Sequence, residues 1–91
     1  MDKKRVHIIV QGKVQGVFFR ASTKDKAIEL ELSGFVRNMP DGTVEIVAEG
    51  SQKQLQKLVD WCHIGPDRSI VSEVHSDWQT YIAEFEAFNI H

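Results

Sequence analysis

Alternating apolar and polar residues mark the first predicted strand, RVHIIVQ, at residues 5–11. Its apolar face consists of three residues of the same parity: Val6, Ile8 and Val10. This period of two is typical of a half-buried strand, because successive side chains point to opposite faces of a sheet. The strand runs into Gly12, where the pattern changes.

Helical spacing begins at Phe19. One face of the predicted helix consists of Phe19, Thr23, Ala27 and Leu30. Charged residues cover the rest of the helix surface. The pattern predicts a helix that starts at Phe19 and ends near Gly34.

A hairpin is predicted next. GFVRN, residues 34–38, and TVEIVAE, residues 43–49, are the two strands, and MPDG between them supplies the Pro, Asp and Gly of a tight turn. Asn38 stands at the entry to this turn. The second strand has an apolar face made of Val44, Ile46 and Ala48.

The second helix has the clearest signals. Ser51 followed by Gln54 matches a capping box, which predicts a helix start. Four apolar residues then follow at helical spacing: Leu55, Leu58, Val59 and Cys62. Gly-Pro-Asp at residues 65–67 ends the helix, because glycine suits a left-handed exit and proline cannot continue it.

Two further strands are predicted at residues 69–78 and 85–90. In the last one, Phe85, Phe88 and Ile90 do not share one parity, so the strand requires a bulge. The order strand, helix, strand, strand, helix, strand, with an extra C-terminal strand, predicts an α+β fold of the ferredoxin-like type. In this fold two helices pack on one face of a mostly antiparallel sheet.

Composition adds that residues 1–91 form a single domain, since chains of this length rarely support two cores. The apolar fraction of 42% and the net charge of -2 indicate an ordinary globular domain without a surface for bulk nucleic acid. The N-terminal apolar run, residues 6–10, is shorter than a secretion signal requires, and no stretch reaches the length of a membrane span. We therefore expect a cytoplasmic protein with no membrane partner. A monomer is the default expectation.

Cysteine and histidine usage argues against a metal site. The single cysteine, Cys62, cannot form an internal disulfide or a multi-thiolate metal site. The four histidines lack the pairwise spacing of metal ligands, so we expect surface histidines and no bound metal.

The loop GKVQGVFFRAS, residues 12–22, is the candidate anion site. Gly12 and Gly16 would let the backbone turn tightly, so that the N–H groups from Gln15 to Arg20 converge on one oxyanion at a helix start. The Arg20 guanidinium could bind the same group. Taken alone, however, this glycine spacing favours an ordinary strand-to-helix turn, and Asn38 alone is typical of a turn residue.

Two segments together resemble a known family. VQGKVQGVFFR, residues 10–20, and GFVRNMPDGTVEIVAEG, residues 34–50, resemble the two signature segments of the acylphosphatase family. ASTKDKAIELELS between them is similar to that family's first helix, so the resemblance covers nearly the whole chain. It implies a ferredoxin-like sandwich, hydrolysis of an acyl phosphate to a carboxylate and inorganic phosphate, and no metal or organic cofactor.

The same resemblance implies the site residues. Arg20 and Asn38 match the family's catalytic arginine and asparagine. The phosphate-binding loop matches Gln15, Gly16, Val17, Phe18, Phe19 and Arg20. The family frequently ends in arginine and tyrosine after a Phe-x-Ile pattern, whereas this chain ends Phe88-Asn89-Ile90-His91, which weakens the match at the C-terminal edge.

Two alternatives remain open. The same element order carries RNA-recognition domains, but these need exposed aromatics on the two central strands, and residues 5–11 and 43–49 contain none. A relative that binds phosphate or another anion without turnover is the second alternative, because a fold does not determine a function.

Overall fold

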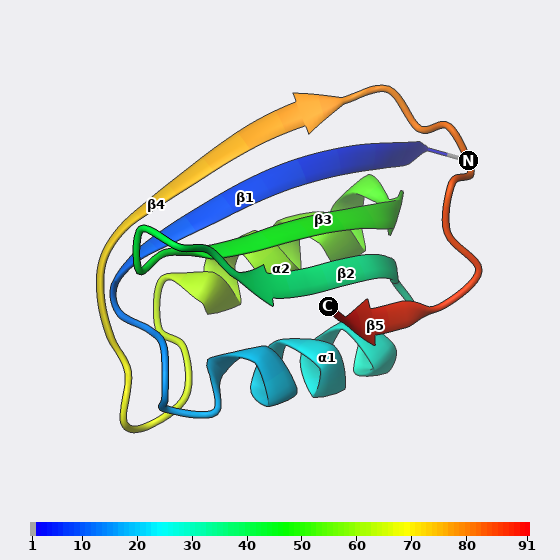
Figure 1. Ribbon diagram of the computed structural model, residues 1–91. Coiled ribbons are helices and arrows are strands. Elements are labelled where there is room, and N and C mark those ends of the chain that lie inside the picture. Colours follow the sequence, from blue (N-terminus) through cyan, green and yellow to red (C-terminus); the bar gives the residue numbers. More distant parts are fainter. Residues whose placement is uncertain (1) are drawn as a thin grey trace.

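The computed structural model of the chain describes residues 2–91, which form a five-stranded sheet with two helices on one of its faces (Figure 1). The predicted ferredoxin-like α+β fold is confirmed. In chain order the elements are β1 (Lys3–Lys13), α1 (Phe19–Glu29), β2 (Ser33–Asn38), β3 (Val44–Ser51), α2 (Gln52–Cys62), β4 (Ile70–Gln79) and β5 (Phe88–Ile90).

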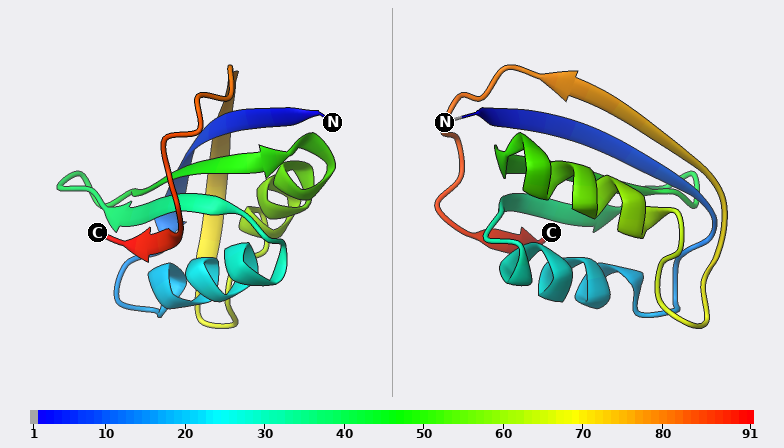
Figure 2. Two further views of the ribbon diagram at one scale, coloured as in Figure 1. Left: turned by 90° about the vertical axis from the view of Figure 1, so that its right-hand side faces the viewer. Right: turned by 180° about the vertical axis from the view of Figure 1, so that it is seen from behind.

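The strands lie in the order β4-β1-β3-β2-β5. The first four pair with one another antiparallel, whereas β5 runs parallel to β2. Both helices lie on the same face of this sheet, as the two views of Figure 2 show. This arrangement places the end of β1, the start of α1 and the end of β2 at one end of the molecule.

The hydrophobic core lies between the sheet and the helices. Val6, Ile8 and Val10 of β1 are fully buried. The predicted apolar faces of β3 and α2 are buried as well: Val44, Ile46, Ala48, Leu55, Leu58, Val59 and Cys62. Burial raises the pKa of the Cys62 thiol to about 12, so this cysteine packs in the core as a small apolar residue and stays protonated.

The start of α2 confirms its predicted cap. The Ser51 hydroxyl accepts a hydrogen bond from the Gln54 backbone N–H at 3.3 Å. The bond satisfies one of the N–H groups that have no partner inside a helix. The helix ends at Cys62, before the predicted stop at Gly65.

The predicted end of the first helix is wrong. Helix α1 ends at Glu29, and the chain leaves it through Glu31, whose φ of 59° is left-handed. The Leu32 N–H donates to the Ala27 carbonyl, which closes this exit, and Gly34 already lies in β2. The exit uses a glutamate instead of the glycine that usually marks such a turn, so the pattern carried no signal for it.

The last strand is shorter than predicted. Only Phe88–Ile90 pair with β2, whereas Phe85 belongs to the connector that follows β4. The rings of Phe85 and Phe35 form a T-shaped pair with a centroid distance of 5.9 Å. The chain turns at Ala83, where φ is 52°, so the mismatch in parity comes from the connector and not from a bulge in the strand.

A buried carboxylate holds this connector against the sheet. Glu49 of β3 accepts hydrogen bonds from the backbone N–H groups of Ile82 and Glu84, both at 2.9 Å, and lies 3.4 Å from the Arg5 guanidinium. Arg5 also pairs with the Glu84 carboxylate at 2.7 Å. Burial raises the pKa of Glu49, but these N–H groups and Arg5 outweigh it and hold the pKa below its ordinary value.

Candidate active site

A cleft of about 320 Å³ lies between the start of α1 and the ends of β2 and β5. It is lined by Val14, Gly16, Phe18, Phe19, Arg20, Ala21, Asn38 and Ile90. The structure therefore brings Arg20 and Asn38 to one cleft, although they come from different elements of the chain.

The loop before α1 has the backbone shape of an anion nest. Gly16 has a φ of 72° and Phe18 a φ of 63°, both left-handed, and Val17 stands between them. Alternation of left-handed and right-handed residues turns successive N–H groups toward a common point. A β-carbon at Gly16 would meet no neighbouring atom within 4 Å, so glycine is favoured there by its φ and not by space.

Helix α1 begins without a protein cap, in contrast to α2. The residue before it, Phe18, has no side-chain oxygen to accept a hydrogen bond from the first N–H groups, and the first turn contains no acidic residue. The backbone N–H groups of this turn thus lack a side-chain partner within the described chain. Together with the helix dipole they favour a bound anion.

Gly12 has a different role from the one predicted. It lies within β1, at a shift in the pairing register between β1 and β4. A β-carbon on Gly12 would come 2.1 Å from the Ile70 carbonyl oxygen. Gly12 is therefore required by the close approach of β4, and the nest begins further along the chain.

Arg20 is the cation of the cleft. It is the second residue of α1, it is exposed, and its side chain borders the cleft. Among residues 2–91 it forms no ion pair and donates no side-chain hydrogen bond, unlike Arg5 and Arg37. Its guanidinium is thus available to a ligand with two acceptor oxygens.

Asn38 is the last residue of β2 and faces the same cleft. Its side-chain oxygen is buried and has no hydrogen-bond partner within the described residues. A buried acceptor left unpaired costs about 1–3 kcal/mol, so such groups usually have a purpose outside folding. A half-turn about the Cβ–Cγ bond exchanges the oxygen and nitrogen of this amide, so it can accept from or donate to a small ligand.

Gln15 connects the loop to the hairpin. Its side-chain amide donates to the Met39 carbonyl at 2.8 Å and to the Thr43 carbonyl at 2.9 Å. Met39 and Thr43 close the predicted turn directly after Asn38, so this one amide fixes the distance between the loop and Asn38.

The structure does not bring every predicted loop side chain into the cleft. The side chains of Phe18, Phe19 and Arg20 line it together with Gly16, whereas Gln15 faces the hairpin and Val17 is buried. The backbone is the part of these last two residues that remains available to a ligand.

Sequence reasoning missed Ile90 as a cleft residue. Parallel pairing places Ile90 opposite Val36, two residues before Asn38, and so brings it to the cleft. No local pattern signals this position, because it depends on pairing between segments more than 50 residues apart.

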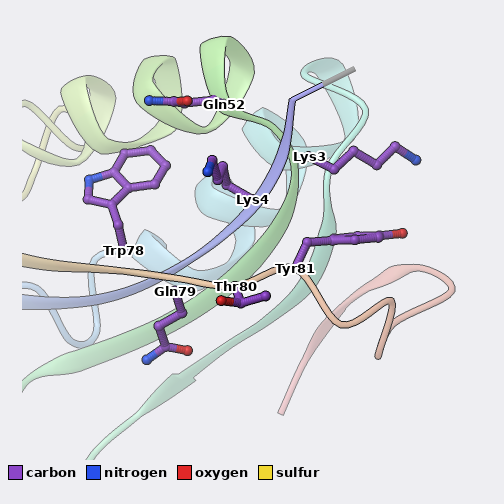
Figure 3. A pocket seen from close by; sticks show the side chains of 7 residues that line it. All are labelled: Lys3, Lys4, Gln52, Trp78, Gln79, Thr80 and Tyr81. Carbon is purple, nitrogen blue, oxygen red and sulfur yellow. The ribbon is translucent and has the colours of Figure 1, made fainter.

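A second and larger hollow, of about 810 Å³, lies at the other end of β1 (Figure 3). It is lined by Lys3, Lys4, Gln52, Trp78, Gln79, Thr80 and Tyr81. The Lys3 ammonium lies over the Tyr81 ring, 5.5 Å from its centroid, and the side chain of Gln79 accepts from Arg5. None of the predicted site residues borders this hollow.

No group of three His, Cys, Asp or Glu side chains in residues 2–91 is placed to hold a metal ion. Neither helix in that range has the length and apolar character needed to cross a membrane.

Comparison with known proteins identifies the family. A family model described as acylphosphatase matches residues 6–90. An acylphosphatase of Marinobacter nauticus is 54% identical over 88 residues, covering 97% of this chain and 96% of that protein. One of Pelotomaculum thermopropionicum is 49% identical over 90 residues, covering 99% and 98%. The solved acylphosphatase from Coxiella burnetii has a TM-score of 0.93 and 38% identity, covering 99% of this chain and 94% of that one. The chain belongs to the acylphosphatase family.

Proposed function

We propose that Arg20 and the loop N–H groups hold the phosphoryl group of an acyl phosphate while Asn38 orients the attacking water. The reaction class, hydrolysis of an acyl phosphate, follows from the family. The roles rest chiefly on one observation: an arginine without an ion pair and an asparagine with an unpaired amide border the same cleft beside an uncapped helix start.

The chemistry needs no strong general acid. The leaving group of an acyl phosphate is a carboxylate, which departs without taking a proton. Transfer of the phosphoryl group mainly requires positioning and stabilisation of charge, with the attacking and leaving oxygens in line. In this proposal preorganised N–H donors and the planar guanidinium supply that stabilisation.

The water is activated by position. An amide is not a base at neutral pH, so Asn38 can only align the water by hydrogen bonds. The proton that the water loses passes to an oxygen of the substrate's own phosphate group. The fixed distance set by Gln15 between loop and hairpin supports this in-line geometry.

Hydrolysis of acetyl phosphate by wild type, Arg20→Gln and Asn38→Ala tests these roles. We expect each substitution to lower kcat/KM about a hundredfold or more, the range for loss of one preorganised donor. Arg20→Gln should also weaken inhibition by inorganic phosphate, whereas Asn38→Ala should largely preserve it. Unchanged turnover in either variant would remove its assigned role, and a chelator should leave wild-type rates unaltered.

The non-catalytic alternative has its own signature. If wild type fails to hydrolyse acyl phosphates, yet inorganic phosphate raises its unfolding temperature, the cleft binds anions without turnover. A rise in unfolding temperature together with turnover supports the enzyme.

The same proposal extends to partners and location. We propose that residues 1–91 work as one monomeric domain in the cytoplasm, without nucleic acid. The net charge of -2 supports the absence of a nucleic-acid partner. So does the open face of the central strands β1 and β3, where His7 pairs with Glu45 at 2.8 Å and Arg37 binds the same carboxylate, in place of stacking aromatics.

A further inference from the structure

The cleft has an apolar half that the phosphoryl group does not use. Arg20, Asn38 and the loop N–H groups form its polar half. Phe18 and Ile90 also line the cleft, and both side chains are exposed, by 76% and 41%. An acyl phosphate likewise has two halves, a charged phosphate and an acyl group that can be apolar.

Phe18 is held in a conformation that packing does not explain. Its φ of 63° is unusual for a bulky residue, and its ring lies outside the hydrophobic core. Within residues 2–91 no other aromatic ring pairs with it. The nest accounts for this backbone conformation but not for the exposure of the ring, and a large apolar surface exposed beside a reaction site points to a role in binding.

Ile90 faces the cleft because of strand alternation. Phe88 and Ile90 lie two residues apart in β5, so their side chains share one face of the sheet. Phe88 is buried in the core beneath the helices, and Ile90 continues this face past the core to the cleft. The β5–β2 pairing keeps it close to Asn38.

We propose that Phe18 and Ile90 form the contact surface for the acyl group, and that these two side chains determine how strongly the enzyme discriminates an aromatic or branched apolar acyl group from acetyl. This proposal rests on the proposed function, because it assumes that the phosphoryl group occupies the polar half of the cleft. The apolar acyl group gains affinity by covering the two exposed side chains, and the acetyl group is too small to cover both.

Benzoyl phosphate and acetyl phosphate provide the test, compared as the ratio of their kcat/KM values. Phe18→Asn removes the ring but keeps a residue that tolerates the left-handed conformation. Ile90→Ser removes the second apolar group. Ile82→Asn is the matched control, because Ile82 is 61% exposed and lies in the connector, outside the cleft.

We expect the wild-type ratio to favour benzoyl phosphate. Phe18→Asn should lower this ratio about tenfold and Ile90→Ser about threefold, mainly through the KM for benzoyl phosphate, within the range for one apolar contact. The ratio for Ile82→Asn should equal that of wild type. The inhibition constant of inorganic phosphate should stay within twofold in Ile90→Ser and in Ile82→Asn, since neither residue belongs to the phosphate-binding loop.

The two proposals fail in different ways. A wild type that hydrolyses neither substrate contradicts the proposed function. A wild type that hydrolyses both, with a ratio unchanged in Phe18→Asn and in Ile90→Ser, overturns the acyl-group surface and leaves hydrolysis intact. If Phe18→Asn also weakens phosphate inhibition, the loop itself has changed, and Ile90→Ser alone decides the question.

Discussion

The two hollows at opposite ends of β1 differ in the features that indicate chemistry. The hollow at Lys3 and Lys4 has more than twice the volume of the cleft at Arg20 and Asn38, about 810 against 320 Å³, and two cations against one. Yet both of its lysines are exposed, and the Lys3 ammonium lies over the Tyr81 ring. The smaller cleft has a left-handed Phe18, an uncapped helix and an unpaired buried amide.

This difference shows that size and charge are poor markers of a reaction site. Exposed lysines are well solvated, so they cost the fold little and hold no ligand in a fixed geometry. Strain and unpaired polar groups cost free energy in the folded protein. Where strained residues and unpaired polar groups lie together, a ligand that forms hydrogen bonds with those groups offsets this cost.

The largest effect should come from the geometry of the Arg20 cation. Arg20→Lys keeps the charge but loses the planar fork of donors, and we expect kcat/KM for acetyl phosphate to fall about a hundredfold. Arg68→Lys, at an exposed arginine that does not border the cleft, is the control and should be silent. Near-normal turnover in Arg20→Lys would show that Arg20 acts only through its positive charge and that its planar donor geometry is not needed.

A smaller loss should follow when the cleft is loosened without touching its ligand groups. Gln15→Ala removes the hydrogen bonds to the Met39 and Thr43 carbonyls. We expect unfolding free energy to fall by about 2 kcal/mol and kcat to fall about tenfold, since Asn38 loses its set distance from the loop. Urea unfolding and steady-state kinetics measure both.

Gln15→Glu is the matched variant. It keeps the size of the side chain but cannot donate to two carbonyls at neutral pH. It should therefore lose activity as Gln15→Ala does. Wild-type activity in both variants would show that the bridge is dispensable for the cleft.

Substitution of Glu49 should lower the stability of the protein without changing its activity. Glu49 lies under the connector, where it accepts hydrogen bonds from the Ile82 and Glu84 N–H groups, and it does not line the cleft. Glu49→Gln should cost about 2 kcal/mol of unfolding free energy at pH 7 while changing kcat/KM less than twofold. Because the pKa of Glu49 is lowered in the folded protein, its contribution is complete above the ordinary glutamate pKa of about 4.3 and is lost as the pH falls through the folded value.

Urea unfolding of wild type and Glu49→Gln at several pH values measures this. The difference in unfolding free energy should be constant from pH 7 to about 5.5 and shrink at lower pH. A difference that grows on acidification would contradict the lowered pKa.

The smallest effect is expected in the larger hollow. The double variant Lys3→Gln/Lys4→Gln removes both of its cations. We expect kcat/KM and phosphate inhibition to stay within twofold of wild type, because exposed charges at the far end of β1 are screened by salt. A tenfold loss would assign part of substrate binding to that hollow.

The sequence pattern correctly predicted the elements that depend only on residues close together in the chain. The α2 stripe from Leu55 to Cys62 and the turn after Asn38 depend on neighbouring residues, and both are confirmed. Glu49 could not be recognised as buried, because alternation assigned it to the polar face and the connector that covers it comes some 33 residues later. The exit of α1 at Glu31 uses a left-handed residue that propensity disfavours.

The candidate site divides in the same way. Arg20 and Asn38 could be named from two sequence segments, since each segment has its own signature. The β1–β3–β2 register and the Gln15 side-chain hydrogen bonds bring the two residues to one cleft. Neither feature can be predicted from a local sequence pattern. Ile90 depends on the pairing of β5 with β2 and was missed for that reason.

One measurement tests most directly whether the smaller cleft is the phosphate site. Amide and side-chain signals of 15N-labelled protein are followed by NMR as inorganic phosphate is added. We expect saturable shifts for the backbone amides of residues 16–21 and for the Asn38 side-chain amide, with the Trp78 indole N–H unchanged. Shifts centred on Lys3, Lys4 and Trp78, with residues 16–21 silent, would contradict it.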